Sequence, residues 1–168
     1  MNLRDMLSAL SEAVTTTASL FAVLIGAWIF SNYVNMAGLP TQLQALVLNW
    51  GTSPFLVMAM IILIYVLLGC VFESMSMLLL TVPVFFPVVV ALGFDPVWFG
   101  IVVVVVVEIS LITPPVGLNV FVLKRVVQDV SIATIFRGVT PFWIVDLIRL
   151  AVLLGIPAVT LFLPNSIH

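Results

Sequence analysis

A Thr-Pro-Pro sequence interrupts one of the most apolar runs in this chain of 168 residues. Pro114 and Pro115 have no backbone N–H, and their rings clash with carbonyls of the preceding turn. The residue before each proline is also pushed away from helical angles. We therefore expect the helix to unwind around Ile112 to Pro115, which frees carbonyl oxygens of the preceding turn. Such breaks persist in membranes only inside protein or beside a cavity, where they contact cations and anionic substrates. The alternative is a proline kink that serves packing alone.

A second polar interruption, residues 73–76 (Glu-Ser-Met-Ser), separates the apolar stretches 54–72 and 77–92. It is either a cytoplasmic loop between two full spans or the tip of a re-entrant hairpin that enters from outside. In the second case, Ser74 and Ser76 supply oxygens at mid-membrane depth, facing the Thr-Pro-Pro sequence. The residue pattern leaves both alternatives open.

Glu108 lies within the apolar run before the Thr-Pro-Pro sequence. Ionisable groups at this depth are rare, face the protein interior and are functional by default. Glu108 is expected to pair with a cation, to take up a proton, or to hold Lys124 or Arg149 in the folded bundle. Asp146 and Arg149 are three residues apart, so they can also neutralise each other on one helical face.

Composition identifies the solvent of this chain as lipid. Hydrophobic residues make up 64% and charged residues 7%, whereas soluble domains carry about 25% charged residues. Spanning helices need about 20 apolar residues each, so roughly four to six passages fit one compact domain. We expect no signal peptide, because the first apolar run is long and lacks a cleavage-like end. No basic cluster supports nucleic-acid binding. No nucleophile elbow or metal-ligand spacing supports an enzyme, and Cys70 is expected to be a packing residue.

The expected fold is therefore an all-α membrane domain over residues 1–168. Polar turns and prolines divide it into a helix (15–34), a short amphipathic helix at the interface (39–50), a hairpin (54–92), an interrupted helix (97–123), a surface helix (126–140) and a last helix (141–163). Trp98, Phe99, Phe142 and Trp143 lie near expected ends of spans, where aromatic residues anchor helices at the membrane interface.

Charge orients this arrangement. When the passages are counted from the N-terminus, Arg4, Lys124, Arg125 and Arg137 fall on one side, and no Lys or Arg falls on the other. Cytoplasmic loops carry the excess of Lys and Arg, so this side is expected to be cytoplasmic. The C-terminus is then outside.

Three stretches carry a resemblance to a known family: residues 69–83 (GCVFESMSMLLLTVP), 93–100 (GFDPVWFG) and 108–119 (EISLITPPVGLN). They resemble the large membrane (permease) subunit of TRAP (tripartite ATP-independent periplasmic) transporters, and the similarity extends over nearly the whole chain. Family members usually carry Asp where this chain has Glu73. Their large subunit is also much longer, with two inverted halves, and this chain resembles only the C-terminal half. We therefore expect a fragment, a split product or a truncated gene.

The resemblance implies half of an inverted-repeat, elevator-type transporter in the bacterial inner membrane, with a broken transmembrane helix and a re-entrant hairpin. It implies sodium-coupled uptake of an organic acid of the C4-dicarboxylate or sialic-acid type, with Na⁺ as coupling ion and no other cofactor. The implied partners are a periplasmic substrate-binding protein, a small membrane subunit and the missing N-terminal half of the permease. A non-transporting assembly subunit derived from a truncated permease is the alternative.

The resemblance also implies which residues form the site, and none of them is catalytic. The hairpin tip and the unwound helix together would hold the cation and the carboxylate of the substrate. The implied cation site consists of Glu73, Ile112, Thr113, Pro114 and Gly117. The implied substrate contacts are Ser74, Ser76 and Asn119.

Overall fold

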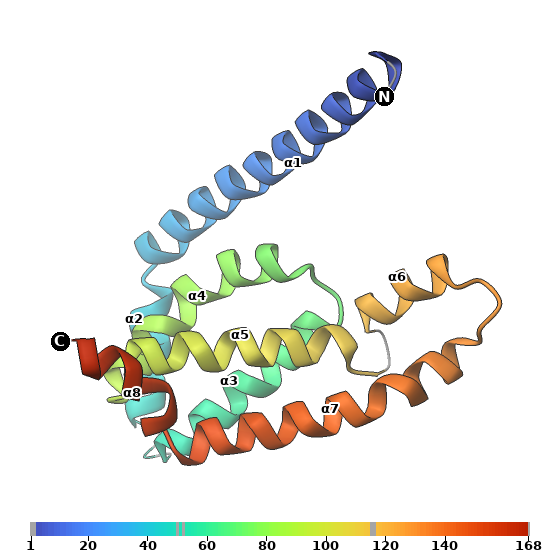
Figure 1. Cartoon of the computed structure of the whole chain (residues 1–168). Coiled ribbons are helices and arrows are strands. Elements are labelled where there is room, and N and C mark those ends of the chain that lie inside the picture. Colours follow the sequence, from blue (N-terminus) through green and yellow to red (C-terminus); the bar gives the residue numbers. More distant parts are fainter. Residues whose placement is uncertain (1–2, 50, 52, 115–116, 168) are drawn as a thin grey trace.

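The computed structural model describes residues 3–49, 51, 53–114 and 117–167, and every regular element in this part of the chain is a helix (Figure 1). In lipid, a helix satisfies its own backbone hydrogen bonds, so an apolar chain folds in this way. The helices are α1 (Leu3–Met36), α2 (Leu39–Asn49), α3 (Pro54–Gly69), α4 (Ser74–Ala91), α5 (Pro96–Ile112), α6 (Leu118–Val126), α7 (Ile132–Gly155) and α8 (Ala158–Ile167). The all-helical prediction is confirmed.

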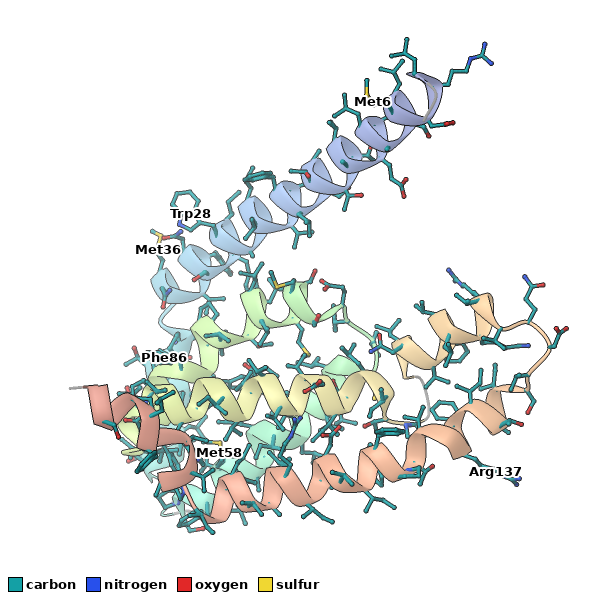
Figure 2. All side chains as sticks on the ribbon, viewed as in Figure 1. Met6, Trp28, Met36, Met58, Phe86 and Arg137 are labelled. Carbon is teal, nitrogen blue, oxygen red and sulfur yellow. The ribbon has the colours of Figure 1, made fainter. Side chains whose placement is uncertain are left out.

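Three of these helices, α1, α4 and α7, are long and apolar enough to cross a membrane, and α3 and α5 are shorter apolar helices. With 34 residues, α1 is about 51 Å long, well beyond the ~30 Å hydrocarbon core of a bilayer. Its N-terminal part projects away from the other helices (Figure 1). The labelled side chains Met6, Trp28 and Met36 are exposed along it (Figure 2). Its start at Leu3 extends the predicted 15–34 helix by more than three turns.

The core of the bundle forms around α5, which contacts α3, α4, α6, α7 and α8. Nine of its residues are buried, including Val102, Val103 and Val105 to Val107. Valine is a weak helix former because its branched side chain is restricted at χ1. Burial against five neighbouring helices outweighs that preference here. In Figure 1, α5 runs through the middle, with α4 on one side and α3 and α7 on the other.

Side-chain caps fix where several helices begin. Ser53, Glu73, Asp95 and Ser131 each precede a helix and accept a backbone N–H from its first turn. Each cap satisfies donors that the first turn of a helix leaves without an intrahelical partner. The polar residues between the apolar stretches therefore act as helix starts, and the hairpin arms are joined by a turn of only a few residues.

Two predicted boundaries near the C-terminus are wrong. The predicted surface helix over 126–140 does not exist as a unit, because α6 ends at Val126 and α7 begins at Ile132 after its Ser131 cap. From there α7 continues through Pro141 to Gly155. The predicted single helix over 141–163 is instead divided between α7 and α8 at Ile156 and Pro157.

Trp98 explains how the division between α7 and α8 is accommodated. Pro157 has no N–H to donate to the carbonyl of Leu153, four residues earlier. The indole Nε1 of Trp98 donates to that carbonyl instead, at 2.8 Å. Trp98 and Phe99 are both only 2% exposed, so their predicted role as interface anchors is wrong. They lie in the core between α5 and its neighbours.

Candidate functional site

The hairpin tip is organised by the carboxylate of Glu73, which caps α4. Its Oε1 accepts the backbone N–H of Met75 at 3.0 Å and the hydroxyl of Ser74 at 3.1 Å. Its Oε2 accepts the N–H of Ser76 at 3.0 Å and the hydroxyl of Ser76 at 3.2 Å. The negative charge of Glu73 therefore lies at the positive end of the α4 dipole. Both serine hydroxyls donate their protons to this carboxylate, so their oxygen lone pairs remain available as acceptors.

The helix before the Thr-Pro-Pro sequence ends at Ile112, because Thr113 adopts an extended conformation with φ −77° and ψ 131°. Its backbone N–H donates to the Ser110 carbonyl at 3.2 Å, which replaces the donor that Pro114 lacks. Its hydroxyl donates to the Ile109 carbonyl at 2.7 Å. The same hydroxyl oxygen accepts the indole N–H of Trp143 from α7 at 3.0 Å. Thr113 thus closes the end of α5 and joins it to α7.

The chain resumes helical geometry after Gly117. Pro115 and Val116, which belong to the segment expected to unwind, lie outside the described residues. Gly117 has a φ of +55°, a left-handed conformation that glycine adopts at little cost. A Cβ at this position would lie 3.3 Å from Cε1 of Phe136 and 3.4 Å from the Thr113 carbonyl oxygen. Asn119 is exposed in the first turn of α6.

A close contact joins the end of α3 to the last turns of α5. A Cβ at Gly69, the last residue of α3, would lie 1.8 Å from the Ser110 hydroxyl oxygen. Ser110 is fully buried, and its hydroxyl donates to the Val107 carbonyl at 2.6 Å. The end of α3 therefore lies directly against the last turns of α5. Sequence reasoning did not single out Gly69 or Ser110, although both lie in the stretches that carried the family resemblance.

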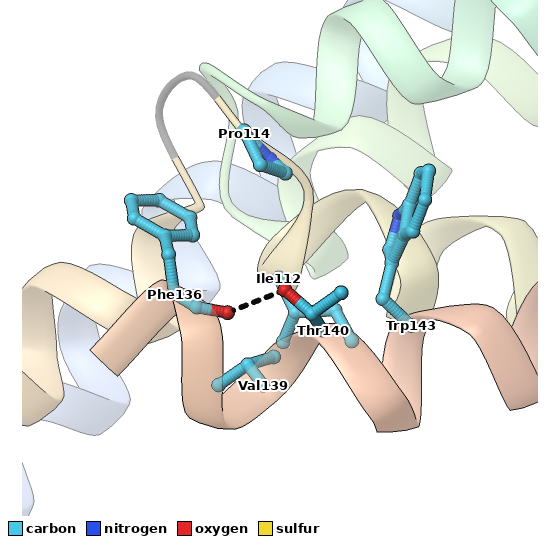
Figure 3. A pocket seen from close by; sticks show the side chains of 6 residues that line it. All are labelled: Ile112, Pro114, Phe136, Val139, Thr140 and Trp143. Carbon is cyan, nitrogen blue, oxygen red and sulfur yellow. Dashed lines mark hydrogen bonds between the residues drawn. The ribbon is translucent and has the colours of Figure 1, made fainter. Parts of the chain in front are cut away.

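Four of the predicted residues line two separate pockets, Ile112 and Pro114 one of them and Glu73 and Ser76 the other. Figure 3 shows a pocket of about 130 Å³ between Ile112 and Pro114 on one side and side chains of α7 on the other. The α7 side chains are Phe136, Val139, Thr140 and Trp143. The Thr140 hydroxyl donates to the carbonyl of Phe136 on its own helix at 2.8 Å. This pocket is therefore mainly apolar.

The second pocket, of about 390 Å³, lies between α1 and the start of α4. Glu73 and Ser76 line it together with polar and apolar side chains of α1. The complete lining is Thr16, Ser19, Leu20, Val23, Leu24, Glu73, Met75, Ser76 and Leu79. The hairpin tip thus faces α1 across a pocket that is separate from the one beside Pro114.

Glu108 forms an ion pair with Arg149 of α7, with 2.9 Å between Oε2 and Nη2. The same Nη2 lies 3.2 Å from Oδ1 of Asp146. The sequence offered Lys124 or Arg149 as the partner that Glu108 holds. In the structure this partner is Arg149, and the Lys124 ammonium instead donates to the carbonyl of Gln128. Within the described residues, no group of three or more His, Cys, Asp or Glu side chains is placed to hold a metal ion.

Comparison with known proteins gives one consistent result. A family profile described as the DctM component of tripartite ATP-independent periplasmic transporters matches residues 1–159. The C4-dicarboxylate TRAP transporter large permease protein DctM of Pseudomonas aeruginosa is 34% identical over 98% of this chain and 38% of its own length. The sialic acid TRAP transporter large permease protein SiaM of Vibrio cholerae is 35% identical over the same shares.

A third relative, the isethionate TRAP transporter permease protein DctMQ of Oleidesulfovibrio alaskensis, is 30% identical over 90% of this chain and 24% of its own length. The chain thus spans less than two fifths of the curated relatives it matches. Together with its apolar helices, these matches show that it is a membrane protein, and they confirm the resemblance seen in the sequence. The chain belongs to the DctM family of TRAP transporter large permeases.

Proposed function

We propose that this chain forms part of a sodium-coupled secondary transporter that takes up organic acids. The substrates of its relatives support the substrate class, since these permeases are named for C4-dicarboxylates and sialic acid. By the same reasoning, a periplasmic binding protein delivers the acid, and a small membrane subunit completes the complex. The chain itself crosses the bacterial inner membrane several times, with its C-terminus in the periplasm.

The contact between Gly69 and Ser110 is the observation that carries this proposal. It places the end of α3 against the last turns of α5, so the helices that precede the two interruptions meet inside the bundle. In our proposal, α3 and α4 form a re-entrant hairpin, and α5 and α6 form one broken membrane crossing. Irregular backbone at membrane depth requires burial in protein or contact with a water-filled cavity.

The proposed cation site takes its ligands from the two interruptions. Within and beside the Thr-Pro-Pro sequence, Thr113 offers a hydroxyl oxygen, and Ile112, Pro114 and Gly117 offer carbonyl oxygens. Glu73, which faces the separate pocket beside α1, would add its carboxylate from the hairpin tip. Hard cations such as Na⁺ prefer oxygen ligands. The Thr113 hydroxyl donates its proton in one hydrogen bond, and its oxygen accepts another. One lone pair of this oxygen is therefore left for a cation.

The proposed substrate contacts are Ser74, Ser76 and Asn119. They lie at the starts of α4 and α6, which differ in how well they can bind an anionic substrate. Glu73 already neutralises the positive end of the α4 dipole. The first turn of α6 receives no hydrogen bond from a side-chain cap. Backbone N–H groups at a helix start bind carboxylates, so the α6 start beside Asn119 is the better position for the substrate carboxylate.

Uptake measurements test the proposal. The chain is reconstituted in vesicles with the rest of the permease, the small subunit and the binding protein, and uptake of C4-dicarboxylates and sialic acid is followed with and without an inward sodium gradient. We expect accumulation of one of these acids only with the gradient. Accumulation that ignores the sodium gradient would refute sodium coupling.

A second candidate function is a non-transporting assembly subunit, which is favoured by one observation: the chain spans only 38% of the P. aeruginosa and V. cholerae relatives. Binding of radioactive sodium to the purified chain separates the two functions. Saturable sodium binding that is lost in Thr113→Ala supports transport. The absence of saturable sodium binding from the complete complex supports the assembly role.

A further inference from the structure

One face of α5 remains open although the helix is otherwise buried. From Gly100 to Ile112, the exposed residues are Gly100, Val104 and Glu108. Residues four apart lie on the same helical face, so these three form a continuous stripe, which we call the α5 stripe. A Cβ at Gly100 would meet no atom within 4 Å. The stripe is therefore a shallow surface along the core helix, wide enough for a neighbouring backbone to approach at Gly100.

The α5 stripe ends in an ion cluster with unequal charges. Arg149 lies between Glu108 and Asp146, so one guanidinium faces two carboxylates and the cluster carries one net negative charge. The Glu108 side chain is 62% exposed and that of Arg149 is 44% exposed. Charged groups inside membrane proteins face protein or water and pair with one another, because contact with lipid is costly. The exposed, unbalanced charge of this surface therefore favours a covering partner with a compensating charge.

We propose that a membrane helix from the remaining portion of the permease packs along the α5 stripe and places a Lys or Arg beside Glu108. The chain spans 38% of the P. aeruginosa relative, so most of that permease lies outside the match. Close packing of membrane helices is favoured where small residues such as Gly100 allow the backbones to approach. A cation on the incoming helix neutralises the excess charge of the cluster.

A second copy of this chain fits the surface poorly. A symmetric dimer brings the same patch of both copies together, so two clusters of net negative charge would face each other. Like charges in a partly desolvated contact repel. The covering helix therefore has a different sequence from the helices of this chain. The inference rests on family membership and on the ion cluster, and it does not depend on sodium coupling.

A capture experiment tests this proposal without sodium or substrate. The chain is co-expressed with a tagged polypeptide comprising the portion of the P. aeruginosa permease outside its match, and the membranes are solubilised in a mild detergent. We expect the tagged polypeptide to capture the chain. Glu108→Lys should lower capture at least tenfold, whereas Glu108→Asp should retain most of it. Asp129→Lys, at an exposed position between α6 and α7, is the matched control and should leave capture unchanged.

A photo-crosslinking amino acid at Val104 identifies what covers the stripe, and one at Leu63, exposed on α3, serves for comparison. Crosslinks from Val104 to the tagged polypeptide support the proposal. It is overturned if the unaltered chain is not captured, if Glu108→Lys is captured as well as the unaltered chain, or if Val104 crosslinks only to a second copy or to lipid.

Discussion

Replacing Gly69 by alanine places a methyl group in the contact between α3 and α5. The added Cβ would lie 1.8 Å from Oγ and 2.5 Å from Cβ of Ser110, and separations under 3.0 Å are essentially absent between real side chains. Ser110 is fully buried, so it has no room to move aside. Overpacking of this kind costs about 1–3 kcal/mol. We expect Gly69→Ala to lower the free energy of unfolding by this amount and to separate the hairpin tip from the end of α5.

Two double variants show whether the contact is the cause. Ser110→Ala removes the atom at 1.8 Å but keeps the one at 2.5 Å, so it should rescue Gly69→Ala only in part. Ser110→Gly removes both atoms and should rescue it more completely, after correction for the cost of Ser110→Gly alone, which is about 1 kcal/mol in a helix. Unfolding is followed by circular dichroism in detergent micelles during titration with a denaturing detergent. Equal destabilisation by Gly69→Ala in the unaltered and Ser110→Gly backgrounds would refute the proposed contact.

Three further predictions concern other named contacts. Trp98→Phe keeps an aromatic ring in the core but leaves the Leu153 carbonyl without its donor, so we expect a loss of about 1–3 kcal/mol in the same unfolding titration. Arg149→Ala leaves Glu108 beside Asp146 without a cation, so it should destabilise the chain more than Glu108→Gln does. Thermal unfolding that ranks the two variants in the reverse order would contradict the ion cluster. In Gly117→Ala, the alanine must adopt a φ of +55°, which should lower the free energy of unfolding by roughly 1–2 kcal/mol. Gly117→Asn should be less affected, because asparagine visits this conformation more readily. Equal melting temperatures for Gly117→Ala and the unaltered chain would contradict the backbone geometry.

Local chemistry was sufficient to predict the interruptions from the sequence. Prolines have no N–H, so the end of α5 before Pro114 follows from covalent structure, and the helix does end at Ile112. The polar residues 73–76 were expected to separate two apolar stretches, and α4 begins within them at Ser74. The amphipathic segment predicted over 39–50 corresponds to α2, which ends at Asn49. In each case, the signal lies within a few residues of the feature.

Tertiary packing determined what the sequence could not reveal. Trp98 lies near the start of an apolar helix, as an interface anchor does, but its indole N–H is used by a carbonyl 55 residues away. The division at Pro157 was missed because its apolar surroundings suggested one continuous span. The sequence offered both Lys124 and Arg149 as partners of Glu108, and the packing of α7 against α5 selects Arg149, 41 residues away in the chain. The separate pockets at the hairpin tip and beside Pro114 likewise depend on where α1 and α7 pack.

The sodium dependence of uptake in Thr113 variants tests the central claim most directly. In vesicles with the complete transporter, Thr113→Ser keeps the hydroxyl, and Trp143→Phe removes the indole donor while keeping the threonine oxygen. We expect both variants to need about the same sodium concentration for half-maximal uptake as the unaltered transporter. Thr113→Ala should need roughly tenfold more, which corresponds to about 1.4 kcal/mol of lost cation binding. An unchanged sodium requirement in Thr113→Ala would contradict a cation site at the end of α5.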